Sequence, residues 1–306
     1  MKVLMTGSSG MVGRNTIAHK KARQFEIIAP SRQELDLTNF GLLNDFLLET
    51  KPDIIVHAAG KVGGIKANIA DPYGFLLENL TLGLNILKAA KECGIGRLLN
   101  LASSCVYPRN AKNPIEETAI LAGSLEPTNE GYALSKIMAI RFCAYISDQF
   151  RELNYKSIVP CNLYGPFDRF DQNNAHLVPA IINKIHDAVV SGNKTVKIWG
   201  DGFARREFMF APDLGGLIWE ACERFDSLPP IMNAGLGYDY TIKEYYEAVG
   251  SVIGFKGDFE FDLSQPVGMR QKLICTKKMT EWGWSPTTEL KHGIAQTYEY
   301  YKGLEH

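Results

Sequence analysis

Short apolar runs alternate with helical patterns through the first half of the chain. Strands are predicted at Val3–Thr6, Ile27–Ala29, Ile54–His57 and Leu98–Leu101, with amphipathic stretches between them. Ile54–Val56 is apolar at every position, which is typical of a strand covered on both faces. Because helices that join parallel strands form right-handed crossovers, the pattern predicts an α/β fold with a doubly wound parallel sheet.

The alternation continues as far as Gly165 and then weakens. Long helices are predicted at Pro72–Cys93 and Glu130–Leu153, and a strand at Ser157–Pro160. Beyond Gly165, Asn, Asp, Gly and aromatic residues become more frequent. Ile231–Gly237 then resembles one more buried strand.

This change of texture indicates two units. We predict a sheet domain over residues 1–165, to which a segment near 206–237 returns. Residues 166–205 and 238–303 would form a smaller α/β domain that covers the carboxyl edge of the sheet and binds the substrate. The last three residues, 304–306, are expected to be the remnant of an expression tag.

Composition narrows the classes of partner. The formal net charge is -1, so no nucleic-acid partner is expected, because such proteins normally carry an excess of basic residues. The six cysteines include no C-x-x-C pair, and no metal site is predicted. No segment approaches the roughly 18 uninterrupted apolar residues of a membrane span, so we expect no membrane partner and a cytoplasmic location.

The first predicted strand runs into a loop with glycines at Gly7, Gly10 and Gly13. In a strand–loop–helix unit of a parallel sheet, backbone N–H groups and the helix N-terminus point at a bound phosphate. Gly7 would allow the tight turn, Gly10 the close approach of a ligand, and Gly13 the packing of helix on strand. The spacing also fits a glycine turn without a ligand, but its context favours a Rossmann-type dinucleotide site.

The residue about 20 positions beyond the glycines reads the adenosine ribose in such sites, and a carboxylate there favours NAD. Here Ser31 and Arg32 stand at the tip of the predicted strand. A guanidinium matches a 2′-phosphate, so Arg32 favours NADP, the alternative being a solvated surface arginine.

Tyr132 and Lys136 lie four residues apart on a predicted helix, so both project from one face. A neighbouring ammonium is expected to lower the pKa of the Tyr132 phenol toward neutrality and to make it a proton donor for a carbonyl group. Ser103 follows a buried strand at its carboxyl end, where its hydroxyl could stabilise a developing oxyanion. If the strand geometry persists, Cys105 shares the side of Ser103; alternatively Cys105 is a small buried hydrophobe.

Taken together, the glycine loop, Ser103, Tyr132 and Lys136, with "NLYGP" at 162–166 and "ARREF" at 204–208, resemble the extended short-chain dehydrogenase/reductases. In this chain Ser8 and Ser9 stand where that family often has a basic residue, and Cys275 stands where aspartate is usual.

Three further motifs narrow the resemblance. "KVGGIKAN" (61–68), "SSCVYP" (103–108) and "LEPTNEGYALSK" (125–136) are similar to those of the GDP-L-fucose synthases, and the similarity extends over nearly the whole chain. It implies conversion of GDP-4-keto-6-deoxy-D-mannose, a GDP-linked 4-keto sugar, to GDP-L-fucose, by epimerisation at C3 and C5 and reduction at C4 with NADPH. It also implies a homodimer formed through the long helices of the first domain.

The resemblance assigns catalytic and binding roles as well. Epimerisation belongs to a cysteine and a histidine, which match Cys105 and His176: a thiolate would remove a proton acidified by the C4 ketone, and an imidazolium would deliver one to the opposite face. The implied cofactor-binding residues are Gly7, Gly10, Met11, Val12, Gly13, Arg32, Asp36, Leu37, Ala58, Ala59, Lys136, Asn162, Leu163 and His176. The implied substrate-binding residues are Val178, Lys184, Trp199, Arg206 and Lys272, with the cations facing the diphosphate and Trp199 near the nucleoside.

Three functions are compatible with the sequence. The first is the epimerase-reductase described above. The second is a C4 reductase, with or without epimerisation, of a related GDP-4-keto sugar such as a GDP-4-keto-6-deoxyheptose or the GDP-colitose precursor. The third is a non-catalytic dinucleotide-binding sensor, which would have no need for Ser103, Tyr132 and Lys136 together.

Overall fold

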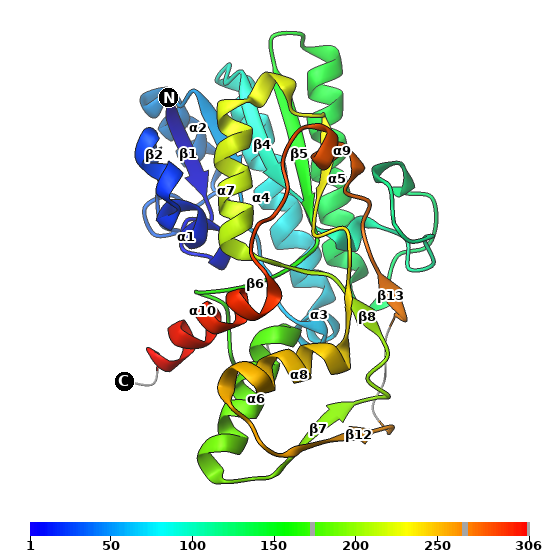
Figure 1. Ribbon diagram of the computed structural model, residues 1–306. Coiled ribbons are helices and arrows are strands. Elements are labelled where there is room, and N and C mark those ends of the chain that lie inside the picture. Colours follow the sequence, from blue (N-terminus) through cyan, green and yellow to red (C-terminus); the bar gives the residue numbers. More distant parts are fainter. Residues whose placement is uncertain (172–174, 265–268, 305–306) are drawn as a thin grey trace.

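The computed structural model describes residues 1–171, 175–264 and 269–304 (Figure 1). Glu305 and His306, which belong to the expected tag remnant, lie outside the described residues. The helices and strands are β1 (Lys2–Thr6), α1 (Met11–Ala18), β2 (Glu26–Ile28), α2 (Phe40–Thr50), β3 (Ile54–His57), α3 (Ile65–Ala70), α4 (Pro72–Glu92), β4 (Arg97–Leu101), α5 (Glu130–Gln149), β5 (Asn154–Pro160), β6 (Asn162–Tyr164), α6 (Leu177–Ser191), β7 (Thr195–Trp199), β8 (Arg205–Arg206), β9 (Phe208–Phe210), α7 (Ala211–Glu223), β10 (Ile231–Ala234), β11 (Tyr240–Thr241), α8 (Ile242–Ile253), β12 (Asp258–Asp262), β13 (Gln271–Lys272), α9 (Lys277–Glu281) and α10 (Leu290–Lys302).

Six strands form the central sheet in the order β10-β5-β4-β3-β1-β2. Every neighbouring pair in it is parallel. After β1 the chain adds β2 on one side and then β3 on the other, so the direction of winding reverses at β1. The predicted doubly wound parallel sheet is therefore confirmed, and its switch point lies between β1 and β3, where ligands of such sheets bind.

Strands of this sheet contribute side chains to two hydrophobic cores, one on each face, because successive side chains of a strand point to opposite faces. Val3 and Met5 belong to a core that includes Leu214 of α7, whereas Leu4 belongs to a core that includes Ile86 of α4. Figure 1 shows α7 in front of the sheet. Because helices cover both faces of the sheet, all four residues of β3 are buried. This is why Ile54–Val56 is apolar at every position.

The end of α5 differs from its prediction. The helix ends at Gln149 rather than Leu153, because Phe150 takes an extended conformation (φ -118°, ψ 97°) and the chain turns to bury Leu153 before β5 begins. The N–H of Tyr155 donates to Ser147 Oγ at 2.8 Å and fixes this turn. A turn held by one side chain and one distant N–H leaves no signal in helical periodicity.

A third core lies beyond the carboxyl edge of the sheet and is enclosed by α6, α8 and α10 (Figure 1). Its strands form small sheets, in which β7 pairs with β12, β8 with β11 and β13, and β6 with β9. The chain returns to the central sheet between these elements, because α7 packs against α1 and β10 pairs with β5.

The segment 238–303, assigned above to the smaller unit, is divided between this third core and the core on the α7 side of the central sheet. α10 packs against α8, but α9 packs against β10, and Met279 and Trp282 belong to the core of the central sheet. A helix as short as α9 carries too little pattern to reveal which core it joins. The other predicted domain boundaries stay predictions.

Two observations concern the described residues as a whole. None of their helices is both long and apolar enough to cross a membrane. No group of three or more of their His, Cys, Asp or Glu side chains is placed to hold a metal ion.

Candidate active site

A cleft of about 490 Å³ opens at the carboxyl ends of β1, β3 and β4, beside the starts of α1 and α4 and the first turns of α5. Every residue that the sequence implicates in cofactor binding lines it, from Gly7 to His176. Ser103 and Tyr132 line it too. The fold thus brings segments that are far apart in the sequence into one site, while contact with a cofactor remains a prediction.

The glycine loop has the geometry of a phosphate cradle. Gly7 has a φ of +71°, and a Cβ on it would lie 2.6 Å from the backbone of Ala58 and Ala59, so the end of β3 requires glycine there. A Cβ on Gly13 would collide with the backbone of Gly7 and Ser8. Gly10 caps α1 without a side-chain hydrogen bond, which leaves the N–H groups of the first helical turn facing the cleft. These features fit a dinucleotide diphosphate.

Ser8 stands where a basic residue is common, and it has a structural role here. Its hydroxyl donates to the carbonyl oxygens of Ala29 and Pro30, at 3.2 and 3.1 Å. The glycine loop is thereby tied to the segment that leads from β2 to Arg32.

The proton-donor group is assembled from β4 and α5. Ser103 follows β4, and its side chain hydrogen-bonds with the Tyr132 hydroxyl. Lys136 lies one turn further along α5; its Nζ donates to the Leu101 carbonyl at 3.1 Å and lies 5.8 Å from the centroid of the Tyr132 ring. The three side chains therefore meet on one wall of the cleft, with Tyr132 and Lys136 on one face of α5 as their spacing predicted.

The predicted fall in the pKa of Tyr132 is wrong. Burial raises the pKa of the phenol above its ordinary value, and it also lowers the pKa of Lys136 to about 8. Loss of hydration of the phenolate is the main cause of the raised pKa of Tyr132, the Cys105 sulfur adds to it, and only the hydrogen bond with Ser103 acts in the opposite direction. Tyr132 therefore rests as a neutral phenol, which is the form that donates a proton.

Cys105 reaches the site by a different backbone path from the one predicted. The strand ends at Leu101, and Ser104–Val106 forms a 3-10 turn that Ser103 caps by accepting from the Cys105 N–H at 3.4 Å. Cys105 is 5% exposed. Burial raises the pKa of its thiol, while Lys272, a hydrogen bond with Ser103, and Lys136 act in the opposite direction. The resting group is a thiol rather than the expected thiolate.

His176 lines the cleft at the N-terminus of α6, where its side chain makes no capping hydrogen bond. Desolvation lowers the pKa of the imidazole below its ordinary value, and the nearby Arg169 guanidinium adds to this effect. At neutral pH the imidazole is therefore neutral, again the reverse of the expected imidazolium.

Two of the predicted substrate residues lie side by side. β13 pairs in parallel with β8, which places Lys272 opposite Arg206. Lys272 is also an electrostatic neighbour of Cys105. Its segment is held by Glu207, which accepts from the N–H groups of Ile274, Leu236 and Gly237 at 3.1, 2.7 and 2.9 Å. Burial raises the pKa of Glu207 to about 7.

The other three predicted substrate residues lie on α6 and β7. Lys184 donates to the carbonyl of Lys197, and Trp199 is half exposed with Lys66 Nζ 5.6 Å from the centroid of its ring. Val178 is fully buried in the third core. Its side chain has no surface to offer a ligand, so any contact would come from its N–H in the first turn of α6.

Several residues of the site were missed in the sequence. Asn68, Glu78 and Arg169 line the cleft, and Glu207 fixes the segment that carries Lys272. A charged or amide residue on an amphipathic helix or in a polar loop looks like a solvated surface residue. Asn68 and Glu207 do lie within two motifs that carry the resemblance, "KVGGIKAN" and "ARREF", whereas no local signal points to Glu78 or Arg169.

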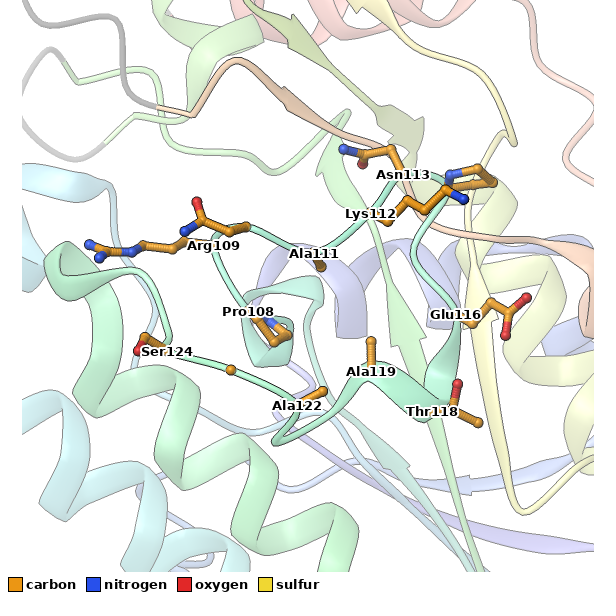
Figure 2. Close-up of a pocket in the computed structure, with 13 residues that line it drawn as sticks. Pro108, Arg109, Ala111, Lys112, Asn113, Glu116, Thr118, Ala119, Ala122 and Ser124 are labelled. Atoms are coloured by element: carbon orange, nitrogen blue, oxygen red, sulfur yellow. The ribbon is translucent and has the colours of Figure 1, made fainter.

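A larger cavity of about 630 Å³ lies within one loop, 108–124, and contains none of the predicted site residues (Figure 2). The N–H of Arg109 donates to the Ser124 carbonyl at 3.0 Å and closes the loop. Figure 2 shows Ala111 and Ala119 pointing toward the cavity, whereas Arg109 and Glu116 extend away from it. Without convergent polar groups this cavity offers no site for chemistry.

Comparisons with known proteins agree with this geometry. Residues 3–235 match the profile described as the NAD dependent epimerase/dehydratase family. The chain is 50% identical over 301 residues to GDP-L-colitose synthase of Yersinia pseudotuberculosis, covering 98% of both chains. It is 48% identical over 300 residues to GDP-L-fucose synthase of Azorhizobium caulinodans, covering 98% of this chain and 96% of the relative. Among solved structures, a GDP-mannoheptose C4 reductase from Campylobacter jejuni with NADP bound superposes with a TM-score of 0.88 at 31% identity, covering 98% of both chains.

Proposed function

The chain belongs to the NAD dependent epimerase/dehydratase family, and on that basis we propose that it is an NADPH-dependent epimerase-reductase of a GDP-linked 4-keto sugar. We infer that the substrate is GDP-4-keto-6-deoxy-D-mannose, converted to GDP-L-fucose by epimerisation at C3 and C5 and reduction at C4. The observation that carries the proposal is the meeting of the glycine cradle with Ser103, Tyr132 and Lys136 in one cleft beside Cys105.

The reduction assigns a separate task to each side chain. The glycine loop and Arg32 would hold the dinucleotide, whose chemistry there would be to supply a hydride to C4. Ser103 and Tyr132 donate hydrogen bonds to the C4 oxygen, and Tyr132 transfers its proton as negative charge develops there. Lys136, anchored on the Leu101 carbonyl, keeps a cation near the phenolate that remains.

Epimerisation requires a base on one face of the sugar ring and an acid on the other. Cys105 and His176 together carry one proton at neutral pH, held by the thiol. The thiolate and imidazolium that the reaction needs carry the same total of one proton, so the active form differs from the resting form only in where that proton sits. Lys272 and Lys136 face the sulfur and stabilise its thiolate.

A coupled assay tests the proposed activity. Purified protein with NADPH and GDP-4-keto-6-deoxy-D-mannose is expected to consume NADPH and to form GDP-L-fucose, identified by chromatography against a standard. A GDP-4-keto-6-deoxyheptose serves as the comparison substrate. If neither of these sugars nor the 3-deoxy sugar considered below causes loss of NADPH absorbance, the proposed activity is rejected.

A second candidate shares the scaffold, and the 50% identity to GDP-L-colitose synthase favours it. Its substrate would be the 3,6-dideoxy precursor of GDP-colitose, which has no hydroxyl at C3. The relatives that match over their full length are named as synthases, which argues against the third reading, a non-catalytic sensor. Faster turnover of the 3-deoxy sugar in the same assay would select the colitose reading.

We also propose that two copies associate through α4 and α5, which pack side by side. Tyr73, Leu77 and Leu84 on α4 and Leu134 and Met138 on α5 are between 38% and 73% exposed. Spacings of four and seven residues place them along one face of each helix. An exposed apolar face over two neighbouring helices is typical of a subunit interface.

Sedimentation velocity is expected to show a dimer of the 34.1 kDa chain. Met138→Glu should shift the protein to monomer, because it would bury a charge in the proposed interface. Leu48→Glu is the matched control, since Leu48 is 50% exposed on α2, a helix that is not part of the proposed interface. A monomer for the unsubstituted chain would reject the proposal.

A further inference from the structure

One carboxylate at the adenosine end of the cleft has no role in the mechanism above. Glu78 lies on α4, lines the cleft, and accepts from Nη1 of Arg32 at 3.2 Å. The two nearby carboxylates that follow β2 are occupied by their own turns. Glu34 accepts from the Ser31 N–H at 2.7 Å, and Asp36 accepts from the N–H and hydroxyl of Thr38 at 2.9 and 2.8 Å.

We propose that Glu78 competes with the 2′-phosphate of the cofactor for Arg32 and thereby limits the preference of this chain for NADPH over NADH. The inference rests on the proposed function, since it assumes that the cleft binds NADP(H). It adds a specificity-determining residue from an element, α4, that the dinucleotide fingerprint does not include.

Arg32 is the group for which competition matters. Among the described residues that line the cleft, the Lys and Arg side chains are Arg32, Lys136 and Arg169. Lys136 stands beside Tyr132, and Arg169 stands near His176, so both lie by the catalytic groups. The glycine loop offers Ser8 and Ser9 instead of a second cation. Arg32 is therefore the cation available to a 2′-phosphate.

A carboxylate and a phosphate fit the same guanidinium fork. The Arg32 side chain is 74% exposed, so its pair with Glu78 is weak and can be broken by a doubly charged phosphate. A phosphate bound by Arg32 would still lie close to the Glu78 carboxylate, and the two anions would repel each other. NADH has a hydroxyl at this position and suffers no such repulsion.

A second cation makes it easy for Glu78 to release Arg32. Its Oε2 lies 4.0 Å from Nζ of Lys61, which also pairs with Asp71 Oδ2 at 2.6 Å. The main chain of Lys61 is fixed, because its N–H donates to Asn79 Oδ1 at 2.9 Å. Glu78 thus keeps a positive neighbour on its own side of the cleft when Arg32 turns to a phosphate.

Binding without any sugar tests the inference. Dissociation constants of NADPH and NADH, and of 2′,5′-ADP and AMP as fragments, would be measured by calorimetry for the unsubstituted chain, Glu78→Gln and Glu92→Gln. Glu78→Gln is expected to raise the preference for each 2′-phosphorylated ligand by about three- to tenfold, and added salt should shrink this gain. Arg32→Ala should lower the preference for 2′-phosphorylated ligands, and the size of that fall shows how much of the preference depends on Arg32.

Glu92→Gln is the matched control, since Glu92 also lies on α4 and pairs with a lysine, Lys88, but does not line the cleft. An unchanged ratio in Glu78→Gln would overturn the inference. A lower ratio would overturn it as well, because it would mean that Glu78 orients Arg32 for the phosphate. An equal gain in the preference for 2′-phosphorylated ligands in Glu92→Gln would also overturn the inference, because the change would then come from the overall charge of the protein. If the unsubstituted chain binds neither dinucleotide, the proposed function itself fails.

Discussion

Replacing Tyr132 by phenylalanine is expected to lower the rate of NADPH-dependent reduction by about 10²–10⁴-fold, the usual contribution of a general acid. The substitution keeps the ring, its packing and its edge contact with Phe75, and removes the hydroxyl that hydrogen-bonds with Ser103. Because burial raises the pKa of Tyr132, the unsubstituted enzyme should hold its phenol protonated throughout the neutral range. The loss should therefore be the same at every pH from mildly acidic to neutral.

Single-turnover loss of NADPH absorbance measures this step without a contribution from product release. Tyr145→Phe is the control, because Tyr145 lies on the same helix and is 64% exposed. The dissociation constant of NADPH should be unchanged in Tyr132→Phe, which separates a lost proton donor from a damaged cleft. Turnover at the unsubstituted rate would remove Tyr132 from the mechanism.

The sequence predicted the scaffold well because burial on both faces leaves a strong pattern. β3 and the glycine turn each follow from a local rule, namely an apolar run for a covered strand and small residues where the backbone must come close. The positions of Ser103, Tyr132 and Lys136 followed from the same rules, because strand ends and helical spacing fix where side chains emerge.

The protonation states could not be read in this way. The spacing of Tyr132 and Lys136 revealed that a phenol meets an ammonium, but not that both are buried, and burial decides the direction of their pKa shifts. The same holds for Cys105 and His176, whose environments are built by β13, the 3-10 turn and the loop that carries Arg169. Those segments are distant in the sequence, so the electrostatics of the site appears only with the fold.

Glu78 and Glu207 show a second limit. Glu78 is surrounded by leucines in the sequence and Glu207 follows two arginines. Each has its role through partners far along the chain: Arg32 for Glu78, and the N–H groups of Leu236, Gly237 and Ile274 for Glu207. Local patterns report periodicity and turns. They do not report which distant donor a carboxylate will meet.

Solvent exchange is expected to show whether the chain epimerises as well as reduces. In deuterated water, with NADP⁺ in place of NADPH so that no hydride is available, the enzyme should exchange the hydrogens at C3 and C5 of GDP-4-keto-6-deoxy-D-mannose. Both hydrogens are acidified by the C4 ketone, and Cys105 and His176 are the acid and base groups that we propose for this step. Mass spectrometry and proton NMR of the recovered sugar give the number and position of the deuterons.

The pH dependence of inversion at these carbons follows from the directions of the two pKa shifts. Inversion needs one proton on the Cys105 and His176 pair: below the pKa of His176 both groups are protonated and no base remains, and above the pKa of Cys105 neither can donate. The pKa of His176 lies below its ordinary 6.5, and that of Cys105 lies above its ordinary 9.0. The plateau of inversion rate should therefore extend beyond both of these values.

Substitutions should separate epimerisation at C3 and C5 from reduction at C4. Cys105→Ser should abolish most of the exchange, because a hydroxyl is a far weaker base than a thiolate, while reduction of the 4-keto group continues. His176→Asn should retain some exchange but impair inversion. Cys93→Ser, at the far end of α4, is the control and should exchange normally. Exchange at C5 alone would point to a 3-deoxy substrate and the colitose reading. If the unsubstituted enzyme reduces the sugar and exchanges nothing, the chain is a reductase only, and Cys105 is a packing residue beneath Ser103.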